Sequence, residues 1–283
     1  MTRPSVLWAA VGAAALVLVG CSSGSTDSPD ATTSSAQSST SAPASTTQMP
    51  LDMTRFGVLP PVPAALAQTT TCSYPESSPA VKENVPPATT EVPTEGIVDV
   101  AVATNQGPIG LTLDRTEAPC TVNSFTSLAS QGYFDDTPCH RLTTSAGLEV
   151  LQCGDPSGTG SRGPGYEYAN ECGDPSGTGS RGPGYEYANE YPTTAFAPED
   201  PALSMPVVYP RGTVAMANAG PGTNGSQFFL VYADSVLPPQ YTVFGTISEE
   251  GLATLDSIAE AGVSGGASDG APIDDVILET VTA

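Results

Sequence analysis

Residues 216–229 read MANAGPGTNGSQFF, and this stretch decides the fold because it joins two predicted strands through a turn. Apolar runs at 212–218 and 227–232 predict the two strands. The glycines, proline and asparagines between them are strong turn formers. In the second strand, Phe228 and Phe229 must point to opposite faces, because side chains alternate along a strand. One ring therefore belongs to a core and the other to the opposite face.

The chain around this stretch repeats the same short-strand pattern. Apolar residues alternate at 98–102 and 109–113 across a tight turn, which predicts a β-hairpin. Pro119 and Gly132 delimit a helix whose apolar residues share one face. The other predicted elements are strands at 139–142, 148–153, 241–247 and 276–282, and a helix within 249–261. About eight strands with glycine- and proline-rich connections predict a mainly β fold, an eight-stranded antiparallel barrel capped by two α-helices.

The charge of the chain excludes one class of partner. Acidic residues number 30 against 8 lysines and arginines, which gives a net charge of −22 and an isoelectric point near 4.1. Such a surface repels nucleic acid, so we expect no binding through phosphates.

The N-terminus predicts export. Arg3 is followed by an apolar run at 6–19, which is short for a membrane span and typical of a secretion signal. The run ends in Leu-Val-Gly-Cys, which resembles the lipobox of bacterial lipoproteins. We therefore expect a signal peptide at 1–20, lipidation of Cys21 and an extracytoplasmic protein anchored to the cell membrane. The alternative is an ordinary cleaved signal with an incidental cysteine.

Composition divides the rest of the chain. Residues 21–71 are rich in Ser, Thr and Pro and predict a disordered tether, although the part from 49 contains apolar residues that can pack on the domain or stay loose. Residues 72–95 form an extended, proline-rich lead-in. The folded domain is expected at 96–283, as a monomer.

Cysteine usage agrees with export. The four residues Cys72, Cys120, Cys139 and Cys153 are an even number, and they predict two disulfides in one of three pairings. The alternative is four buried thiols. A zinc site is disfavoured because no CxxC spacing exists and the chain has a single histidine. The loops at 155–158 and 268–270 lack the ligand spacing of a calcium site, so no metal is expected.

Nineteen residues occur twice in tandem, at 153–171 and 172–190. Only the first copy follows the strand ending at Gln152, and only the second leads into Tyr191. The fold can therefore keep both borders and let one copy bulge from the surface as a neutral duplication. The chief hazard is Cys172, an extra thiol.

Four segments together resemble the cyclophilin family of peptidyl-prolyl isomerases. They read HRL at 140–142, LQCGD at 151–155, the long stretch at 216–229 and YTVFG at 241–245, and their order and spacing match from about 97 to 283. In form the chain looks most similar to exported actinobacterial members. The resemblance implies an eight-stranded barrel with an active groove on its outer wall.

The resemblance also implies a site. It gives the catalytic role to Arg141, and it implies a substrate-binding set of Leu148, Val150, Gln152, Ala217, Asn218, Gln227, Phe229, Leu237 and Tyr241. Glu149 departs from the family, because many members have an aromatic there, and we expect Leu148 to replace it. Two plainer interpretations stay open: Arg141 pairing with a carboxylate, and Asn218 as a turn residue. We expect His140 to be structural.

The implied function is isomerisation of X–Pro bonds in exported polypeptides, which assists their folding and needs no cofactor. The partners would be proline-containing polypeptides and, through Cys21, the membrane. One alternative is a module that binds proline peptides with little or no turnover. Another is a surface adhesin on a stalk.

Overall fold

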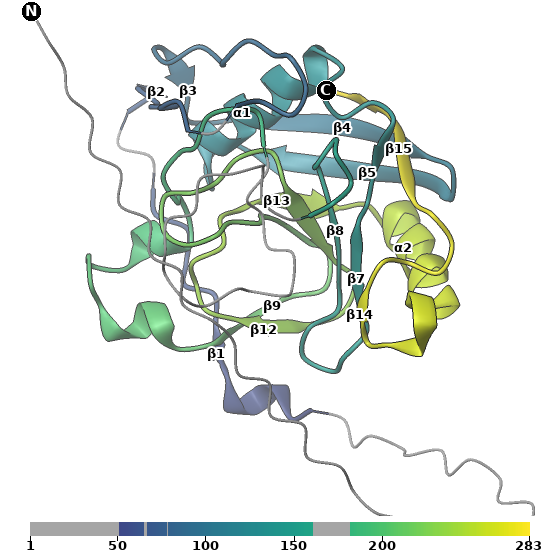
Figure 1. Ribbon diagram of the computed structural model, residues 1–283. Helices are drawn as coiled ribbons and strands as arrows, with labels where there is room; N and C mark the ends of the chain where they lie inside the picture. The colour runs from purple at the N-terminus through teal and green to yellow at the C-terminus, as the bar shows by residue number, and fades with distance from the viewer. Residues whose placement is uncertain (1–50, 65–66, 78, 161–181) are drawn as a thin grey trace, which may run out of the picture. The chain divides into compact units, whose positions relative to one another are not determined.

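A curled antiparallel sheet of ten strands forms the centre of the structure, a computed structural model that describes residues 51–64, 67–77, 79–160 and 182–283 (Figure 1). In order across the sheet, its strands are β14 (Asp269–Gly270), β7 (Arg141–Thr143), β8 (Val150–Cys153), β11 (Phe228–Val231), β10 (Thr213–Met216), β13 (Val243–Ile247), β5 (Gly107–Asp114), β4 (Ile97–Thr104), β15 (Ile277–Thr282) and β6 (Thr137–Pro138). Segments far apart in the sequence thus become neighbours, above all β7, β8 and β11.

The mainly β architecture with two α-helices is confirmed, and so is the hairpin of β4 and β5, where Val100 lies opposite Leu111. The predicted number of strands is not confirmed. Within the described residues the main sheet has ten, although eight of them are longer than two residues. The two extra strands, β6 and β14, are two residues long, too short to give a periodic pattern in the sequence.

Two smaller sheets accompany the main one. They consist of β1 (Gly57–Val58), β9 (Val207–Tyr209) and β12 (Ser235–Leu237), and of β2 (Thr69–Thr70) and β3 (Val92–Pro93). Short 3₁₀ turns lie at Met53–Arg55, Thr193–Ala195, Pro201–Ser204 and Ser264–Gly266. Because β1 pairs in parallel with β9, residues 51–64 pack on the folded unit, which resolves what the sequence left open.

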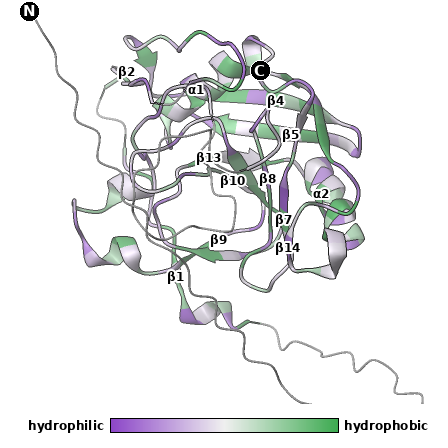
Figure 2. Cartoon of the chain, viewed as in Figure 1, coloured by the Kyte–Doolittle hydropathy of each residue, from purple (hydrophilic) through white to green (hydrophobic). Residues whose placement is uncertain are grey.

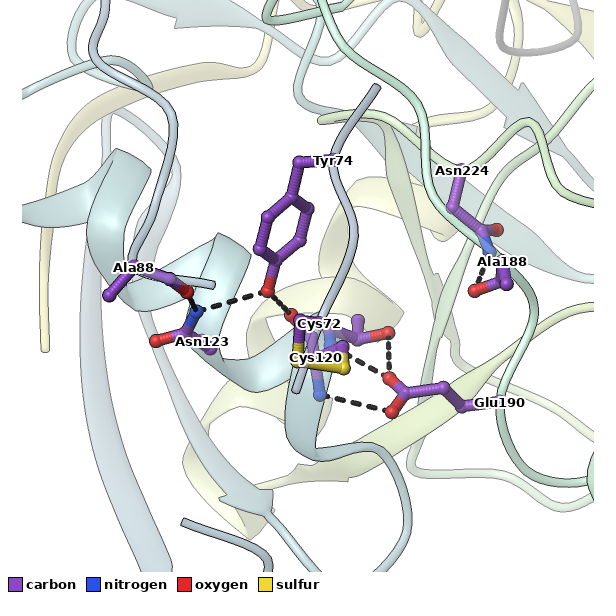
Figure 3. Close-up of a disulfide and its surroundings, with 9 residues drawn as sticks. Cys72, Tyr74, Ala88, Cys120, Asn123, Ala188, Glu190 and Asn224 are labelled. Carbon is purple, nitrogen blue, oxygen red and sulfur yellow. Dashed lines mark hydrogen bonds between the residues drawn. A yellow bond between two sulfur atoms is a disulfide. The ribbon is translucent and has the colours of Figure 1, made fainter. Parts of the chain in front are cut away.

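The two helices begin in different ways. Helix α2 (Glu249–Ala261) has its own cap, since the Ser248 hydroxyl accepts a hydrogen bond from the amide of Gly251 at 3.0 Å. Helix α1 (Pro119–Ser130) has no side-chain cap at Ala118. Its first turn is capped from elsewhere: the amides of Cys120 and Thr121 donate to the Glu190 carboxylate at 3.0 and 2.7 Å (Figure 3). A carboxylate there also complements the positive end of the helix.

Two apolar clusters lie on opposite faces of the central strands. The core cluster gathers residues of both helices and one face of the strands, among them Phe125, Leu151, Phe228 and Phe244. What we call the opposite-face cluster consists of Val150, Tyr191, Val207, Tyr209, Ala215, Ala217, Phe229, Val231 and Val243, with Leu59, Leu148, Leu237 and Tyr241 packed against it. Figure 2 shows β9 and β10 largely in the hydrophobic colour. The strands therefore bury apolar residues on both faces.

Two disulfides tie the periphery to this framework. One joins Cys72 to Cys120 and holds the lead-in against α1 (Figure 3), where the Tyr74 hydroxyl also donates to the Cys120 carbonyl at 2.8 Å. The other joins Cys139 to Cys153. Of the three pairings that the sequence allowed, the structure therefore has this one.

The duplicated segment enters the fold through its two outer ends. The first copy begins inside β8 at Cys153, and the carboxylate of Asp155 accepts a hydrogen bond from the amide of Gly160 at 2.9 Å. From the other side, a Cβ on Gly182 would lie 3.3 Å from the amide nitrogen of Ser226, whose hydroxyl donates to the Gly154 carbonyl at 2.7 Å. Both ends thus meet at Ser226. The predicted bulge and Cys172 lie outside the described residues.

The predicted signal peptide, Cys21 and most of the predicted tether also lie outside the described residues. Among the residues that are described, no helix is both long and apolar enough to cross a membrane.

Candidate active site

A row of side chains crosses five neighbouring strands on the face opposite the core. The register pairs Arg141 of β7 with Gln152 of β8, and Gln152 with Phe229 of β11. Phe229 in turn lies opposite Ala215 of β10, which lies opposite Val243 of β13. Directly opposed residues share a face, so this row runs from a cation through an amide to apolar groups.

The amide in this row links the cation to a second amide. The Arg141 Nη1 group donates to Gln152 Oε1 at 3.3 Å, and Gln152 Nε2 donates to Gln227 Oε1 at 2.9 Å. Both glutamines are almost fully buried, at 2% and 1% exposure. Buried amides must be hydrogen-bonded, so this chain fixes their orientation and offers the guanidinium an oxygen.

A carboxylate that the sequence analysis did not include completes the polar end. Asp269 of β14 accepts from Arg141 Nε and Nη2, both at 2.8 Å. The plainer interpretation of Arg141, an ion pair with a carboxylate, is therefore correct as far as it goes. It does not exclude a second role, since the same guanidinium also faces Gln152.

The apolar end is built around Phe229. Its ring meets that of Tyr241 edge-on, with 5.7 Å between the ring centres. Leu148, Leu237 and Tyr241 are partly buried and pack against the opposite-face cluster, to which Val150 and Ala217 belong. The structure thus brings all the predicted apolar residues together. Leu148 packs here, and its expected replacement of the family's aromatic stays a prediction.

Asn218 has a structural task at the end of this face. Its Nδ2 group donates to the Gln240 carbonyl at 2.9 Å, and its Oδ1 accepts from the amide of Gly220 at 3.1 Å. The side chain therefore holds the turn after β10, as the plainer interpretation had it. A substrate-binding role for the Asn218 backbone stays a prediction.

Burial shifts the pKa values of two groups near the site, His140 and Glu149, toward the neutral form. Burial lowers the pKa of His140, the largest of three influences that include Asp155 and Arg141. Burial raises the pKa of Glu149, whose amide is held by the Ser235 hydroxyl at 2.9 Å. Among the described residues, no group of three or more His, Cys, Asp or Glu is placed to hold a metal ion.

Part of this face was missed by the sequence analysis. Tyr191, Val207 and Tyr209 belong to the opposite-face cluster, and Leu59 packs against it. The Tyr191 hydroxyl also donates to the Pro60 carbonyl at 2.7 Å. The β-branched and aromatic run Val207-Val208-Tyr209 was an available signal for a strand. Nothing in the local sequence could show that Leu59, far away in the chain, would reach the same face.

The chain is similar in sequence to known proteins that share one name. A family model described as "Cyclophilin type peptidyl-prolyl cis-trans isomerase/CLD" matches residues 98–283. The chain is 54% identical over 225 residues to "Probable peptidyl-prolyl cis-trans isomerase B" of Mycobacterium tuberculosis, covering 79% of this chain and 67% of that protein. It is 54% identical over 212 residues to the protein of the same name from Mycobacterium leprae, covering 74% and 65%. A solved cyclophilin-type isomerase of Cryptosporidium parvum shares 26% identity and a TM-score of 0.47, over 66% of this chain and 97% of that one.

Proposed function

The chain belongs to the family of cyclophilin-type peptidyl-prolyl cis-trans isomerases, and we propose that it isomerises X–Pro bonds of exported polypeptides with Arg141 as its catalytic residue. The observation that carries the assignment of the site is the row across the strands. Arg141 and the ring of Phe229 flank Gln152 on one face, so a cation stands beside an apolar surface.

The reaction makes and breaks no covalent bond, so the site needs only to lower a rotational barrier. An X–Pro amide resists rotation because its C–N bond is partly double, with a barrier of ~18–20 kcal/mol. As the amide twists, conjugation is lost and the proline nitrogen gains a lone pair. A guanidinium fixed beside that nitrogen can donate to it in the twisted state and not in the planar one. Such differential stabilisation lowers the barrier.

The apolar end supplies the complementary task. A proline ring held against Phe229, Leu237 and Tyr241 stays still while the rest of the peptide rotates about the amide. The buried amides of Gln152 and Gln227, bonded to each other and to Arg141, stiffen the wall between these two ends. In this proposal the apolar residues hold the proline ring, and Arg141 stabilises the transition state.

The exported setting is part of the proposal. It is supported by two disulfides, which persist in oxidising compartments, and by the N-terminal sequence that ends in Cys21. Lipidation there would anchor the protein to the outer face of the cell membrane. Replacing Cys21 by Ala should then move the protein from the membrane fraction to the soluble fraction, and unchanged membrane association would contradict the anchor.

The assignment of Arg141 is tested by the Arg141→Ala variant, measured with a protease-coupled isomerisation assay on a proline peptide. We expect kcat/KM to fall about 100-fold, the usual cost of one transition-state donor. The variant should fold, because the Asp269 side chain that loses its partner is 44% exposed and stays solvated. The matched control is Arg211→Ala, which removes another arginine held by a carboxylate, that of Asp256.

The outcomes separate two functions. Loss of turnover in Arg141→Ala alone supports the isomerase. If wild type and Arg141→Ala both bind proline peptides and neither speeds isomerisation, the site is a binding module and the proposed catalytic role is wrong. Equal activity of wild type and variant would also remove Arg141 from the mechanism.

A further inference from the structure

We propose that Asp269 is a positioning residue, which holds the Arg141 guanidinium in the one orientation that leaves two of its N–H groups for the substrate. The proposal rests on the catalytic role of Arg141 proposed above. It adds a residue that the sequence analysis did not include.

The contact between the two residues fixes the plane of the guanidinium. Asp269 Oδ1 accepts from Nε and Oδ2 accepts from Nη2, both at 2.8 Å. A pair of parallel bonds from a carboxylate to this edge of an arginine allows neither tilt nor rotation without breaking one of them. A long flexible side chain is thereby reduced to a single conformation.

The Arg141 guanidinium has more N–H groups than Asp269 and Gln152 engage. A guanidinium carries five N–H groups. Asp269 engages the one on Nε and one on Nη2, and Gln152 engages one on Nη1 at 3.3 Å. Among the described residues, these bonds leave one N–H on Nη1 and one on Nη2 for a substrate. This is the pair that could meet a twisting amide.

The position of Asp269 is set by backbone pairing. In the ladder between β14 and β7, Asp269 lies opposite Thr143, two residues along the strand from Arg141. Residues in this diagonal relation share a face and lie within reach of long side chains. The Thr144 amide also donates to the Ser268 carbonyl at 2.9 Å, which adds a further clamp on the same side.

The loop that carries Asp269 is closed on itself. The Ser264 amide donates to the Ala271 carbonyl, and the Ile273 amide donates to the Gly262 carbonyl, both at 2.9 Å. Val263, between these closures, is buried at 4% exposure. The carboxylate is therefore held from a braced loop and does not depend on the arginine for its position.

A second ion pair in the chain provides an internal comparison. Arg211 donates to Asp256 through Nη1 and Nη2 at 2.7 and 2.8 Å, so it is also bidentate. Its arginine side chain is 39% exposed, whereas that of Arg141 is 13% exposed. Exposed pairs add little to stability. A purely structural role predicts that breaking either pair changes stability and leaves the turnover of the folded protein unchanged, whereas a positioning role predicts that breaking the Asp269 pair lowers turnover.

The experiment uses the full chain with Asp269→Ala, Asp269→Asn and the control Asp256→Ala. We expect Asp269→Ala to lower kcat about tenfold and leave KM within about twofold, as when a group that orients a reacting residue is removed. Asp269→Asn should lower kcat less, because the amide oxygen of the asparagine can still accept one hydrogen bond from Arg141. Asp256→Ala should keep the wild-type kcat. Thermal unfolding of each variant checks that it is folded.

Two further readouts separate positioning from a structural effect. In an Arg141→Lys background, Asp269→Ala should cause no further loss, because an ammonium cannot form the bidentate pair. In the ¹⁵N-resolved NMR spectrum, the Arg141 Nε–H signal, assigned by its absence in Arg141→Lys, should be protected from exchange in wild type. It should be lost in Asp269→Ala and kept in Asp256→Ala.

The failures are distinguishable. If Arg141→Ala is inactive and Asp269→Ala keeps wild-type kcat, the positioning role is overturned and the proposed function stands. It is also overturned if Asp256→Ala loses as much, or if turnover falls with the Arg141 Nε–H signal unchanged. If Arg141→Ala keeps wild-type turnover, the proposed function itself fails.

Discussion

The two apolar clusters differ although the same strands build both. On one face, β8, β11, β10 and β13 contribute Leu151, Phe228, Met216 and Phe244 to the core cluster, together with residues of both helices. On the other face, the alternate residues meet segments without helices, from β9, β12 and residues 51–64. One period-two pattern thus builds two apolar faces, one that packs against the helices and one that we propose as the substrate surface.

The sharpest test of this division is the pair Phe228→Ala and Phe229→Ala. Phe228 is fully buried and contacts the rings of Phe125 and Phe134, with centres 5.3 and 5.9 Å away. We expect its loss to lower the free energy of unfolding by about 3–5 kcal/mol, which denaturant titration measures.

Phe229→Ala should act mainly on the reaction. We expect a smaller loss of stability and a fall in kcat/KM of about 10- to 50-fold, since contact with a ring of this size is worth about 2 kcal/mol. The comparison breaks down if, under conditions where both variants are folded, Phe228→Ala is the less active of the two.

Removing each of the two disulfides should have the next largest effect on stability. Chain-entropy arguments for their sequence separations of 48 and 14 give about 4 kcal/mol for Cys72–Cys120 and about 3 kcal/mol for Cys139–Cys153. Replacing each pair by serines should lower stability in that order.

Activity should follow the opposite order. Cys153 directly follows Gln152, and Cys139 lies two residues before Arg141, so loss of this bond loosens both strands at the polar end of the site. We expect kcat/KM to fall in this variant at temperatures where it is folded, and to stay unchanged without Cys72–Cys120. A larger activity loss in the latter would show that the lead-in contributes to the site.

The smallest effect concerns a half-buried acid, Glu117. Glu117 precedes Ala118 of the core cluster, and its charge is the second cause, after burial, that raises the pKa of Tyr191 on the opposite face. Burial, and then the charge of Asp114, raises the pKa of Glu117 from 4.5 to about 7. Its Oε2 atom has no hydrogen-bond partner among the described residues.

The sign of the pH dependence follows. Above pH 4.5 the unfolded chain ionises this acid while the folded protein still holds the proton, so stability falls as the pH rises from 4.5 to 7. We expect Glu117→Gln to remove this slope and to stabilise the protein at pH 8 by about 1–2 kcal/mol, after allowance for partial exposure. Unfolding titrations at pH 5 and pH 8 measure it, and an unchanged slope would contradict the assignment to Glu117.

The longer elements were accessible from sequence because their signals are local. The hairpin of β4 and β5 follows from alternation around a tight turn, and α1 follows from Pro119 and the apolar face that includes Phe125 and Leu128. The predicted apolar site residues also pack together in the opposite-face cluster, and several of them sit in the segments that carry the family resemblance.

What sequence could not provide is long-range pairing. Asp269 sits in a glycine-rich loop that looked like a poor metal site, and its contact with Arg141 depends on a two-residue strand paired across 126 positions, from Thr143 to Asp269. Leu59 reaches the opposite face only because β1 pairs with β9. Likewise, Glu190 caps α1 although it lies 70 residues after Cys120 and 69 residues after Thr121. Such long-range contacts produce no periodic pattern in the sequence.

The meeting of Gly154 of the first copy and Gly182 of the second copy at Ser226 has a genetic consequence. Tandem units are gained and lost in whole periods when a template slips, and every such change in this array would return the same two flanks to the same serine. We therefore expect alleles that differ in copy number here to encode proteins with interchangeable activity.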